Sequence, residues 1–347
     1  MDLDLIHLAK TPKCFSIFHI NGFLLKFLNT HMSTVEKSDP FISVDYWLTK
    51  SNLCLDLPYK DIKRVDEIIK ATGQRHNRPI LFVKTDLLPY YVACLQKIDF
   101  PYILITASND DHCVPTLFMP HRDKMTIMNT VMESPNLIQW YTKNPAVTHR
   151  KIRSVPLGAK WQWKTTQFFG ESKKDHMNIY AEHCMTPKQN MLNSELKTEL
   201  LYFNFTVGTT NTPLYSAHKN IRNVAKNALV KNHFLFQDNM PFPEYIKTLK
   251  KYKFSASPPG RGIDTHRTWE SLMVGTIPII IHTPQDHLFE QLPVLLIQEN
   301  EWSTITHERL EHEYKKIVDN IEQYNFDILY TPYWDRKLEQ IRNNSGI

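Results

Sequence analysis

The residues best suited to chemistry lie in one segment of the C-terminal half, which reads Pro258-Pro-Gly-Arg-Gly-Ile-Asp-Thr-His-Arg-Thr-Trp-Glu. The chain has only 9 glycines, yet Gly260, Gly262 and Gly275 all fall in or just after this segment. Glycines permit backbone conformations closed to other residues, which favours a tight loop after a strand. Asp264 is a suitable helix N-cap, and Gly275 stands where a helix would stop. The segment therefore predicts a helix N-terminus at the carboxyl end of a strand.

Basic side chains crowd the predicted first turn of this helix, where Arg261, His266 and Arg267 follow one another closely. Free backbone N–H groups and the helix dipole already make a helix N-terminus attractive to anions. Three potential cations at that end oppose the dipole and would not be chosen for stability alone. A bound diphosphate would resolve this conflict, because arginine offers a planar fork to phosphate oxygens.

Glu270 shares a helix face with His266, four residues before it, and with Arg267, three residues before it. A carboxylate at this position could accept both hydroxyls of a ribose whose phosphates lie at the helix start. The alternative is a surface Glu–Arg pair on a capped helix. Asp264 and His266 have no further ligand at suitable spacing, so we expect no metal site. We also expect no cofactor and no evident need for a divalent metal.

Four further residues could reach the same anion. Thr210 and Asn211 follow another predicted strand, and Arg222 lies on the next predicted helix with Lys226 one turn later. A solvated helix face is the simpler interpretation of the Arg222–Lys226 pair. His282 follows a later strand and could hydrogen-bond a base or a sugar, although an ordinary surface loop also explains it.

Transfer of a group to a hydroxyl needs a general base. We predict it in the first half of the chain, where polar residues follow the strand expected at 102–106. Asp111 is the first choice, with Asp110 and His112 as rivals and Asp86 behind them. A solvated Asn-Asp-Asp turn is the alternative explanation of this run.

Short apolar runs alternate with helical patterns along the chain, which is typical of an α/β fold. We expect two facing Rossmann-like, doubly wound domains with a ligand cleft between them. The expected parts are an N-terminal acceptor-side domain at 1–165, a linker at 166–195, a nucleotide-sugar-binding domain at 196–325, and a segment at 326–347 that returns to the first domain. The expected strands are 80–83, 102–106, 152–155, 200–207, 233–236, 252–257, 276–281 and 294–297, and the expected helices include 214–230, 243–250, 264–274 and 308–324.

The pattern Pro-Pro-Gly-x-Gly-x-Asp-x-His-Arg-x-Trp-Glu-x-Leu-x-x-Gly-x-Ile-Pro-Ile, from Pro258 to Ile279, resembles the C-terminal signature of exostosin-like glycosyltransferases. Fainter similarity extends over about residues 80 to 335. The resemblance implies the two-domain GT-B fold and an inverting transfer from a nucleotide-sugar donor. It also implies that Glu270 binds the ribose and that basic residues near Arg267 bind the diphosphate.

We therefore expect a glycosyltransferase that moves a sugar from a nucleotide diphosphate sugar, with UDP-sugars as the expected donors, to a hydroxyl of a glycan or protein. Two features depart from the family: no N-terminal membrane anchor is visible, and Pro278 stands where many retaining GT-B enzymes have a second Glu. The alternatives are a nucleotide-sugar-binding protein that has lost catalysis and a nucleotide-sugar epimerase. An epimerase would need a Gly-rich dinucleotide fingerprint that the sequence lacks.

Composition narrows the class of protein further. The formal net charge is +5 and no block of like charges occurs, so we expect no nucleic-acid partner. The five cysteines are dispersed, without a C-x-x-C pair, which favours a reducing compartment. No stretch reads as a signal peptide or as a membrane span of about 20 apolar residues. We expect a soluble, cytoplasmic protein.

Overall fold

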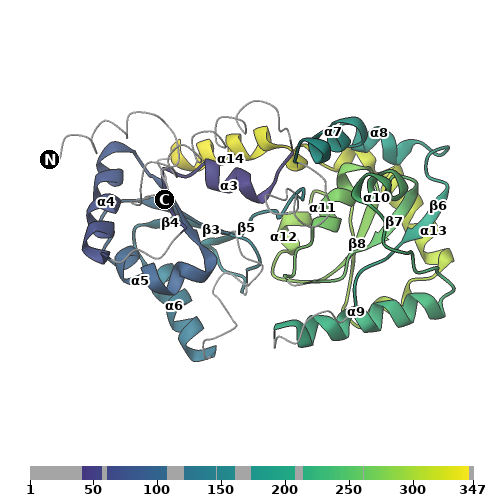
Figure 1. Ribbon diagram of the computed structural model, residues 1–347, viewed down its shortest axis with the longest axis horizontal. Coiled ribbons are helices and arrows are strands. Elements are labelled where there is room, and N and C mark those ends of the chain that lie inside the picture. Colours follow the sequence, from purple (N-terminus) through teal and green to yellow (C-terminus); the bar gives the residue numbers. More distant parts are fainter. Residues whose placement is uncertain are drawn as a thin grey trace. The chain divides into compact units, whose positions relative to one another are not determined.

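The computed structural model describes residues 41–56, 61–107, 121–145, 147–160, 173–207, 214–260 and 262–343. The chain forms two compact units, each built on a parallel sheet (Figure 1). The first contains Val44–Val155 and the chain from Asp335 onward, and the second contains Phe41–Ser43 and Pro156–Trp334. The first unit thus ends ten residues before the boundary expected at 165. The described part of the expected linker forms helices of the second unit.

Within the described residues, the first unit has a five-stranded parallel sheet in the order β1-β2-β3-β4-β5. The strands expected at 80–83, 102–106 and 152–155 are confirmed as β2, β3 and β5, whereas β1 and β4 were not predicted. The elements are α3 (Val44–Thr49), β1 (Leu53–Leu55), α4 (Ile62–Arg75), β2 (Ile80–Lys84), η2 (Thr85–Leu87), α5 (Leu88–Gln96), β3 (Tyr102–Ala107), α6 (His121–Glu133), β4 (Leu137–Thr142), β5 (Ile152–Ser154) and the greater part of α14 (Thr331–Asn343).

Both faces of this first sheet are covered, as expected for parallel strands with nearly continuous apolar sequences. Apolar side chains of α4, α5 and α6 form one core with the strands, including Val65, Leu95 and Met128. On α3, Trp47 is buried and stacks on Tyr141 of β4, with ring centroids 6.4 Å apart. This layering confirms the α/β class for the first unit.

Within the described residues, the second unit has a four-stranded parallel sheet in the order β6-β7-β8-β9. Its elements are α7 (Lys173–His183), α8 (Pro187–Leu192), β6 (Glu199–Tyr202), α9 (Leu214–Lys231), α10 (Phe242–Leu249), β7 (Tyr252–Ala256), α11 (His266–Met273), β8 (Ile277–Ile281), α12 (Asp286–Phe289), β9 (Leu295–Ile297), η4 (Glu301–Thr304), α13 (His307–Asp319), η5 (Ile321–Gln323) and η6 (Phe326–Leu329). None of the helices in the described part of the chain is long and apolar enough to cross a membrane.

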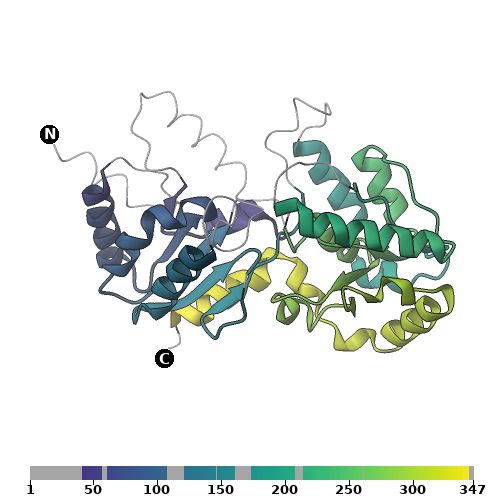
Figure 2. The ribbon, with the colours of Figure 1, turned by 90° about the horizontal axis from the view of Figure 1, so that it is seen from below.

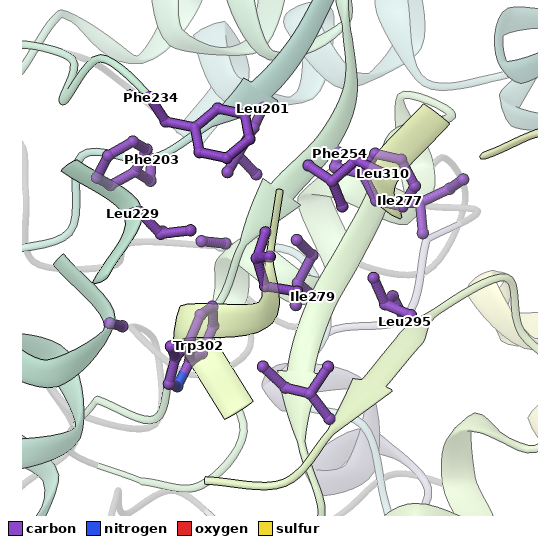
Figure 3. Packing of buried hydrophobic residues seen from close by; sticks show 14 of the residues in the cluster. Leu201, Phe203, Leu229, Phe234, Phe254, Ile277, Ile279, Leu295, Trp302 and Leu310 are labelled. Carbon is purple, nitrogen blue, oxygen red and sulfur yellow. The ribbon is translucent and has the colours of Figure 1, made fainter. Parts of the chain in front are cut away.

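Alternate side chains of a strand point to opposite faces of the sheet, and both faces of the second sheet are covered by helices. Phe254 of β7 packs into an apolar core with residues of α9 and α13 (Figure 3). In Figure 2, α9 is the long helix in front of the strands of this unit. The next residue, Ser255, faces the other way and shares a hydrogen bond of 2.6 Å with Ser271 of α11. One face of the sheet is therefore apolar, while the α11 face also carries polar groups.

The segment expected to be a strand at 233–236 is not one. It keeps a strand-like alternation, since Phe234 is buried and Leu235 is exposed. However, it meets the chain just past the end of β6, where the Gln237 N–H donates to the Phe203 carbonyl at 2.9 Å. One bond beyond the strand end cannot form a ladder. Within the described residues the four strands therefore follow one another in chain order, β6-β7-β8-β9. Ligands of such open parallel sheets bind outside the carboxyl ends of the strands.

The glycines after α11 and before it differ in backbone conformation, and only the one after the helix is as expected. Gly275 is left-handed, with φ at 74°, and follows the helix as predicted. Its N–H donates to Leu272 and the next N–H donates to Ser271, the pattern of a Schellman C-cap. By contrast, Gly260 and Gly262 do not have positive φ. At Gly260 an added Cβ would lie 2.5 Å from Nη2 of Arg222, the far end of a flexible side chain.

We predict that Gly275→Ala destabilises the second unit strongly. A left-handed residue with a side chain costs about 1–3 kcal/mol, and the new Cβ would lie 2.3 Å from the backbone oxygen of Pro187. The free energy of unfolding in urea measures the loss. Gly260→Ala is the matched control, because its Cβ meets only the end of a flexible side chain. Equal losses for the two variants would contradict the assigned role of Gly275.

Candidate functional site

Helix α11 begins at His266, after the loop that follows β7, and its N-cap is Thr265. The Thr265 hydroxyl accepts from the Thr268 N–H at 3.4 Å, which satisfies one free donor of the first turn. The prediction that Asp264 caps the helix is therefore wrong by one residue. Thr265 was not considered as the cap, although threonine is also a favoured N-cap residue, and the choice depends on where the Asp264 carboxylate finds donors.

Asp264 is buried and holds the start of α11 in place. Its Oδ2 accepts from the Leu157 N–H at 2.8 Å, and both its oxygens lie 2.9 Å from the indole nitrogen of Trp269. His266 contributes a second anchor, with Nδ1 2.9 Å from the Gly158 carbonyl. Because a carbonyl oxygen only accepts, Nδ1 must carry the hydrogen. Both residues, predicted as donor-binding, thus bind the 157–158 segment in this structure.

Arg267 lies at the carboxyl end of β6, and its guanidinium group is only partly hydrogen-bonded. Its Nη2 donates to Oδ1 of Asn204, two residues past β6. Its guanidinium carbon lies 5.6 Å from the ring centroid of Tyr202 and 5.8 Å from that of Tyr245, so aromatic rings hold the fork. Although the Tyr245 hydroxyl lies nearby, Nε and Nη1 are buried without a hydrogen-bond partner among the described residues.

Glu270 is buried, with 3% of its surface exposed, in a network of tyrosines. Its two oxygens accept from Tyr180 at 3.2 Å and from Tyr245 at 3.0 Å. Burial, and then the Glu270 charge, raises the pKa of both tyrosines well above its ordinary value, so both hydroxyls stay protonated as donors. The alternative interpretation, a surface Glu–Arg pair, is therefore wrong, because Glu270 is buried and within the described structure it forms no ion pair with Arg267.

Arg222 reaches the same edge of the sheet from α9. Its Nε donates to the Pro259 carbonyl at 2.8 Å and its Nη1 to the Thr206 carbonyl at 2.9 Å, which ties the loop after β6 to the loop after β7. Lys226, one turn later, is directed elsewhere, with Nζ 4.1 Å from the ring centroid of Phe236. The structure therefore separates the pair that the sequence placed together, and only Arg222 belongs to the site.

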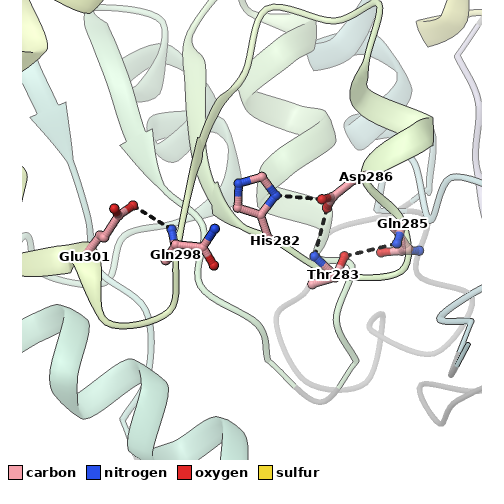
Figure 4. Close-up of polar contacts among 6 residues, drawn as sticks. All are labelled: His282, Thr283, Gln285, Asp286, Gln298 and Glu301. Carbon is pink, nitrogen blue, oxygen red and sulfur yellow. Dashed lines mark hydrogen bonds and ion pairs between the residues drawn. The ribbon is translucent and has the colours of Figure 1, made fainter. Parts of the chain in front are cut away.

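A histidine–aspartate pair lies at the carboxyl end of β8 (Figure 4). His282 Nδ1 is 2.6 Å from Oδ2 of Asp286, and Oδ1 of Asp286 accepts from the Thr283 N–H at 2.8 Å. On the next strand, the Gln298 N–H donates to Oε2 of Glu301 at 2.8 Å. The carboxyl edge of β8 and β9 therefore carries ordered polar groups.

Several predicted site residues lie outside the described residues, and their roles stay predictions. They are Asp110, Asp111, His112, Thr210, Asn211 and Arg261. The strand that leads to the first three, β3, is formed as expected. In the part of the chain that the structure describes, no three His, Cys, Asp or Glu side chains gather as metal ligands.

The tyrosine and asparagine partners of α11 were missed as a group. Tyr180 comes from α7, Tyr202 from β6 and Tyr245 from α10. No spacing in the sequence relates them, since each meets α11 only through the tertiary fold. Asn204 had a weak signal, because polar residues that follow a parallel strand emerge at the carboxyl edge of its sheet.

Comparison with known proteins places the chain only distantly. No protein-family model and no curated protein matches the sequence. A solved structure of a UDP-forming α,α-trehalose-phosphate synthase from Burkholderia xenovorans is similar at 9% identity and a TM-score of 0.41, over 82% of this chain and 79% of that chain. The heptosyltransferase WaaC of E. coli with ADP is similar at 11% identity and a TM-score of 0.22, over 70% and 98%. We draw no functional conclusion from similarities this distant.

We predict that Glu270→Ala lowers the free energy of unfolding by about 2–6 kcal/mol, because each buried hydroxyl left unsatisfied costs about 1–3 kcal/mol. Urea unfolding at neutral pH measures this. Glu244→Ala on α10 removes an exposed carboxylate and should change stability by about 0.5 kcal/mol or less. A Glu270→Ala loss no larger than that of the control would show that the tyrosine network does not hold α11.

Proposed function

We propose that the second unit binds a nucleotide diphosphate sugar and that the protein is a glycosyltransferase. The observation that carries this proposal is the state of Arg267. Two of its donor nitrogens are buried without a partner among the described residues, at the carboxyl edge of a parallel sheet. Buried donors are almost always paired, and one left unpaired marks a place where a ligand belongs.

The ligand that fits this arrangement is an anion with several oxygens. Buried donors that belong to a cation cost more when unpaired than those of neutral groups, so an anion gains most by meeting them. Arg267 is held edge-on by Asn204 and between aromatic rings, which leaves the rest of its fork preorganised for two oxygens of a phosphate. The first-turn amides of α11, an eight-residue helix, add further positive potential.

The position in the sheet favours a nucleotide over a simple anion. Arg267 is on the helix that follows β7 and lies at the carboxyl end of β6, and ligands of doubly wound sheets bind outside this edge with phosphates at the following helix. Arg222 borders the same place through Thr206 and Pro259. A ribose hydroxyl could replace the Tyr245 hydroxyl on Glu270, since both are neutral donors to the same oxygen.

The exostosin-like signature supports the finer parts of the proposal. On its basis we propose a GT-B enzyme that uses a UDP-sugar without a divalent metal and transfers to a hydroxyl of a glycan or protein with inversion. We further propose Asp111 as the general base, with Asp110 and His112 as the alternatives. Inversion is a single displacement, so one base at the acceptor hydroxyl completes it.

A thermal-shift screen against nucleotide sugars and free nucleoside diphosphates tests the function most broadly. A ligand at about 100 times its Kd adds about 2.7 kcal/mol of stability, so the true donor should raise the melting temperature clearly. Donor hydrolysis or transfer by the stabilised protein then separates an enzyme from a protein that only binds. No shift with any nucleotide would contradict the proposal.

We predict that Arg267→Lys weakens nucleoside diphosphate binding by about 10- to 100-fold, corresponding to one to three kcal/mol of charge-assisted bonding. Lysine keeps the charge but loses the fork and its seat between the rings. Isothermal titration with a nucleoside and its diphosphate measures the effect, and the nucleoside should bind both proteins alike. Equal losses for both ligands would indicate that Arg267 only supports the fold.

A further inference from the structure

His282 lies at the sheet edge that carries the proposed diphosphate site. Its N–H donates to the Ile297 carbonyl at 3.0 Å, so the chain is still held as an extension of β8 at this point. β7 and β8 are parallel neighbours, with Ala256 paired to Ile279. His282, just past β8, and the loop that Arg222 binds, just past β7, therefore follow the same carboxyl edge of the sheet.

Asp286 fixes the orientation of the His282 imidazole and places a hydrogen on its Nδ1. Its Nδ1 meets Asp286 at 2.6 Å, and because a carboxylate only accepts, Nδ1 carries a hydrogen. The Thr283 N–H fixes the other carboxylate oxygen. The side chains of His282 and Asp286 remain 42% and 37% exposed. A carboxylate that orients a histidine in this way leaves Nε2 available to a ligand.

An ordinary surface ion pair does not account for the surroundings of this pair. The Lys315–Asp319 pair on α13 has the same i,i+4 spacing, but it stands alone in solvent, with side chains 77% and 56% exposed. Near His282, by contrast, two buried polar atoms have no hydrogen-bond partner in the described structure: Ser257 Oγ just after β7 and Gln285 Nε2 in the His282 loop. Native proteins pair such atoms, and a bound ligand would do so here.

We propose that His282, positioned by Asp286, is a further ligand of the donor diphosphate and binds it through Nε2–H. This inference rests on the proposed function, because it assumes a diphosphate at the Arg267 site. With Nδ1–H engaged by Asp286, a donor hydrogen at Nε2 requires the protonated imidazolium. Asp286 on its own loop supplies the opposing charge. The diphosphate binds without any change in covalent bonds.

Isothermal titration of UDP, ADP, GDP and inorganic pyrophosphate into the purified protein tests this. His282→Ala should weaken the nucleoside diphosphate that binds and pyrophosphate by about the same factor, 5- to 30-fold, while uridine and other nucleosides are unaffected. His282→Gln should recover part of the affinity, because its amide keeps a donor. Lys315→Ala removes a surface cation from a pair of equal spacing, and it should change nothing.

The dependence on phosphate gives a readout that a structural role would not move, because only the probes that contain a diphosphate should lose affinity in His282→Ala. Asp286→Ala should lower affinity less than His282→Ala and should abolish the fixed Nδ1–H form in histidine NMR spectra. Equal affinity for these probes in wild type and His282→Ala would overturn the role of His282 while leaving the diphosphate site intact. Failure of wild type to bind any of the four probes would overturn the proposed function itself, and this inference with it.

Discussion

The placement of two opposite charges on one short helix, Glu270 buried and Arg267 partly buried, is the constraint around which the second unit is built. Both residues lie on α11, yet they contact different partners. Removing charges from water is costly, so each needs hydrogen bonds or a counter-charge close by. For Glu270, two tyrosine hydroxyls meet the need completely. For Arg267, one amide oxygen and two aromatic faces meet it in part.

The two solutions have different consequences. The tyrosine network joins α7 and α10 to α11 and fixes the direction in which the helix presents its first turn. Asp264 and His266 fix the same turn from the other end by bonding to Leu157 and Gly158. A side chain held this firmly costs little entropy when it binds a ligand. The incompletely paired guanidinium is therefore a preorganised group, and its remaining donors are the part of the site left for an anion.

Much of the fold could be predicted from the sequence, because parallel strands with both faces covered read as continuous apolar runs. Ile80–Val83 and Ile277–Ile281 are examples. The C-cap at Gly275 was also readable, since only glycine suits that position. Prediction failed where a tertiary contact decided the outcome. Asp264 looks like a cap until Leu157 and Trp269 are placed beside it.

The site was predicted in position more than in detail. The loop after β7 and the cluster of basic residues identified the edge of the sheet on which Arg222 and Arg267 lie. The burial of Glu270 was not foreseen, because its helix spacing alone fits an exposed face equally well. Its surroundings depend on Tyr180 and Tyr245, which are remote in the sequence. The separation of Lys226 from Arg222 has the same cause, since the Phe236 ring that binds Lys226 comes from a different segment.

The central claim is that the two unpaired donors of Arg267 belong to a diphosphate. A crystal structure with the nucleoside diphosphate that stabilises the protein most tests it directly. The account predicts phosphate oxygens at about 2.7–3.2 Å from Nε or Nη1 of Arg267, the usual range for such hydrogen bonds, with Asn204 still on Nη2. A nucleotide bound with its phosphates elsewhere, and with those two nitrogens still unpaired, would contradict it.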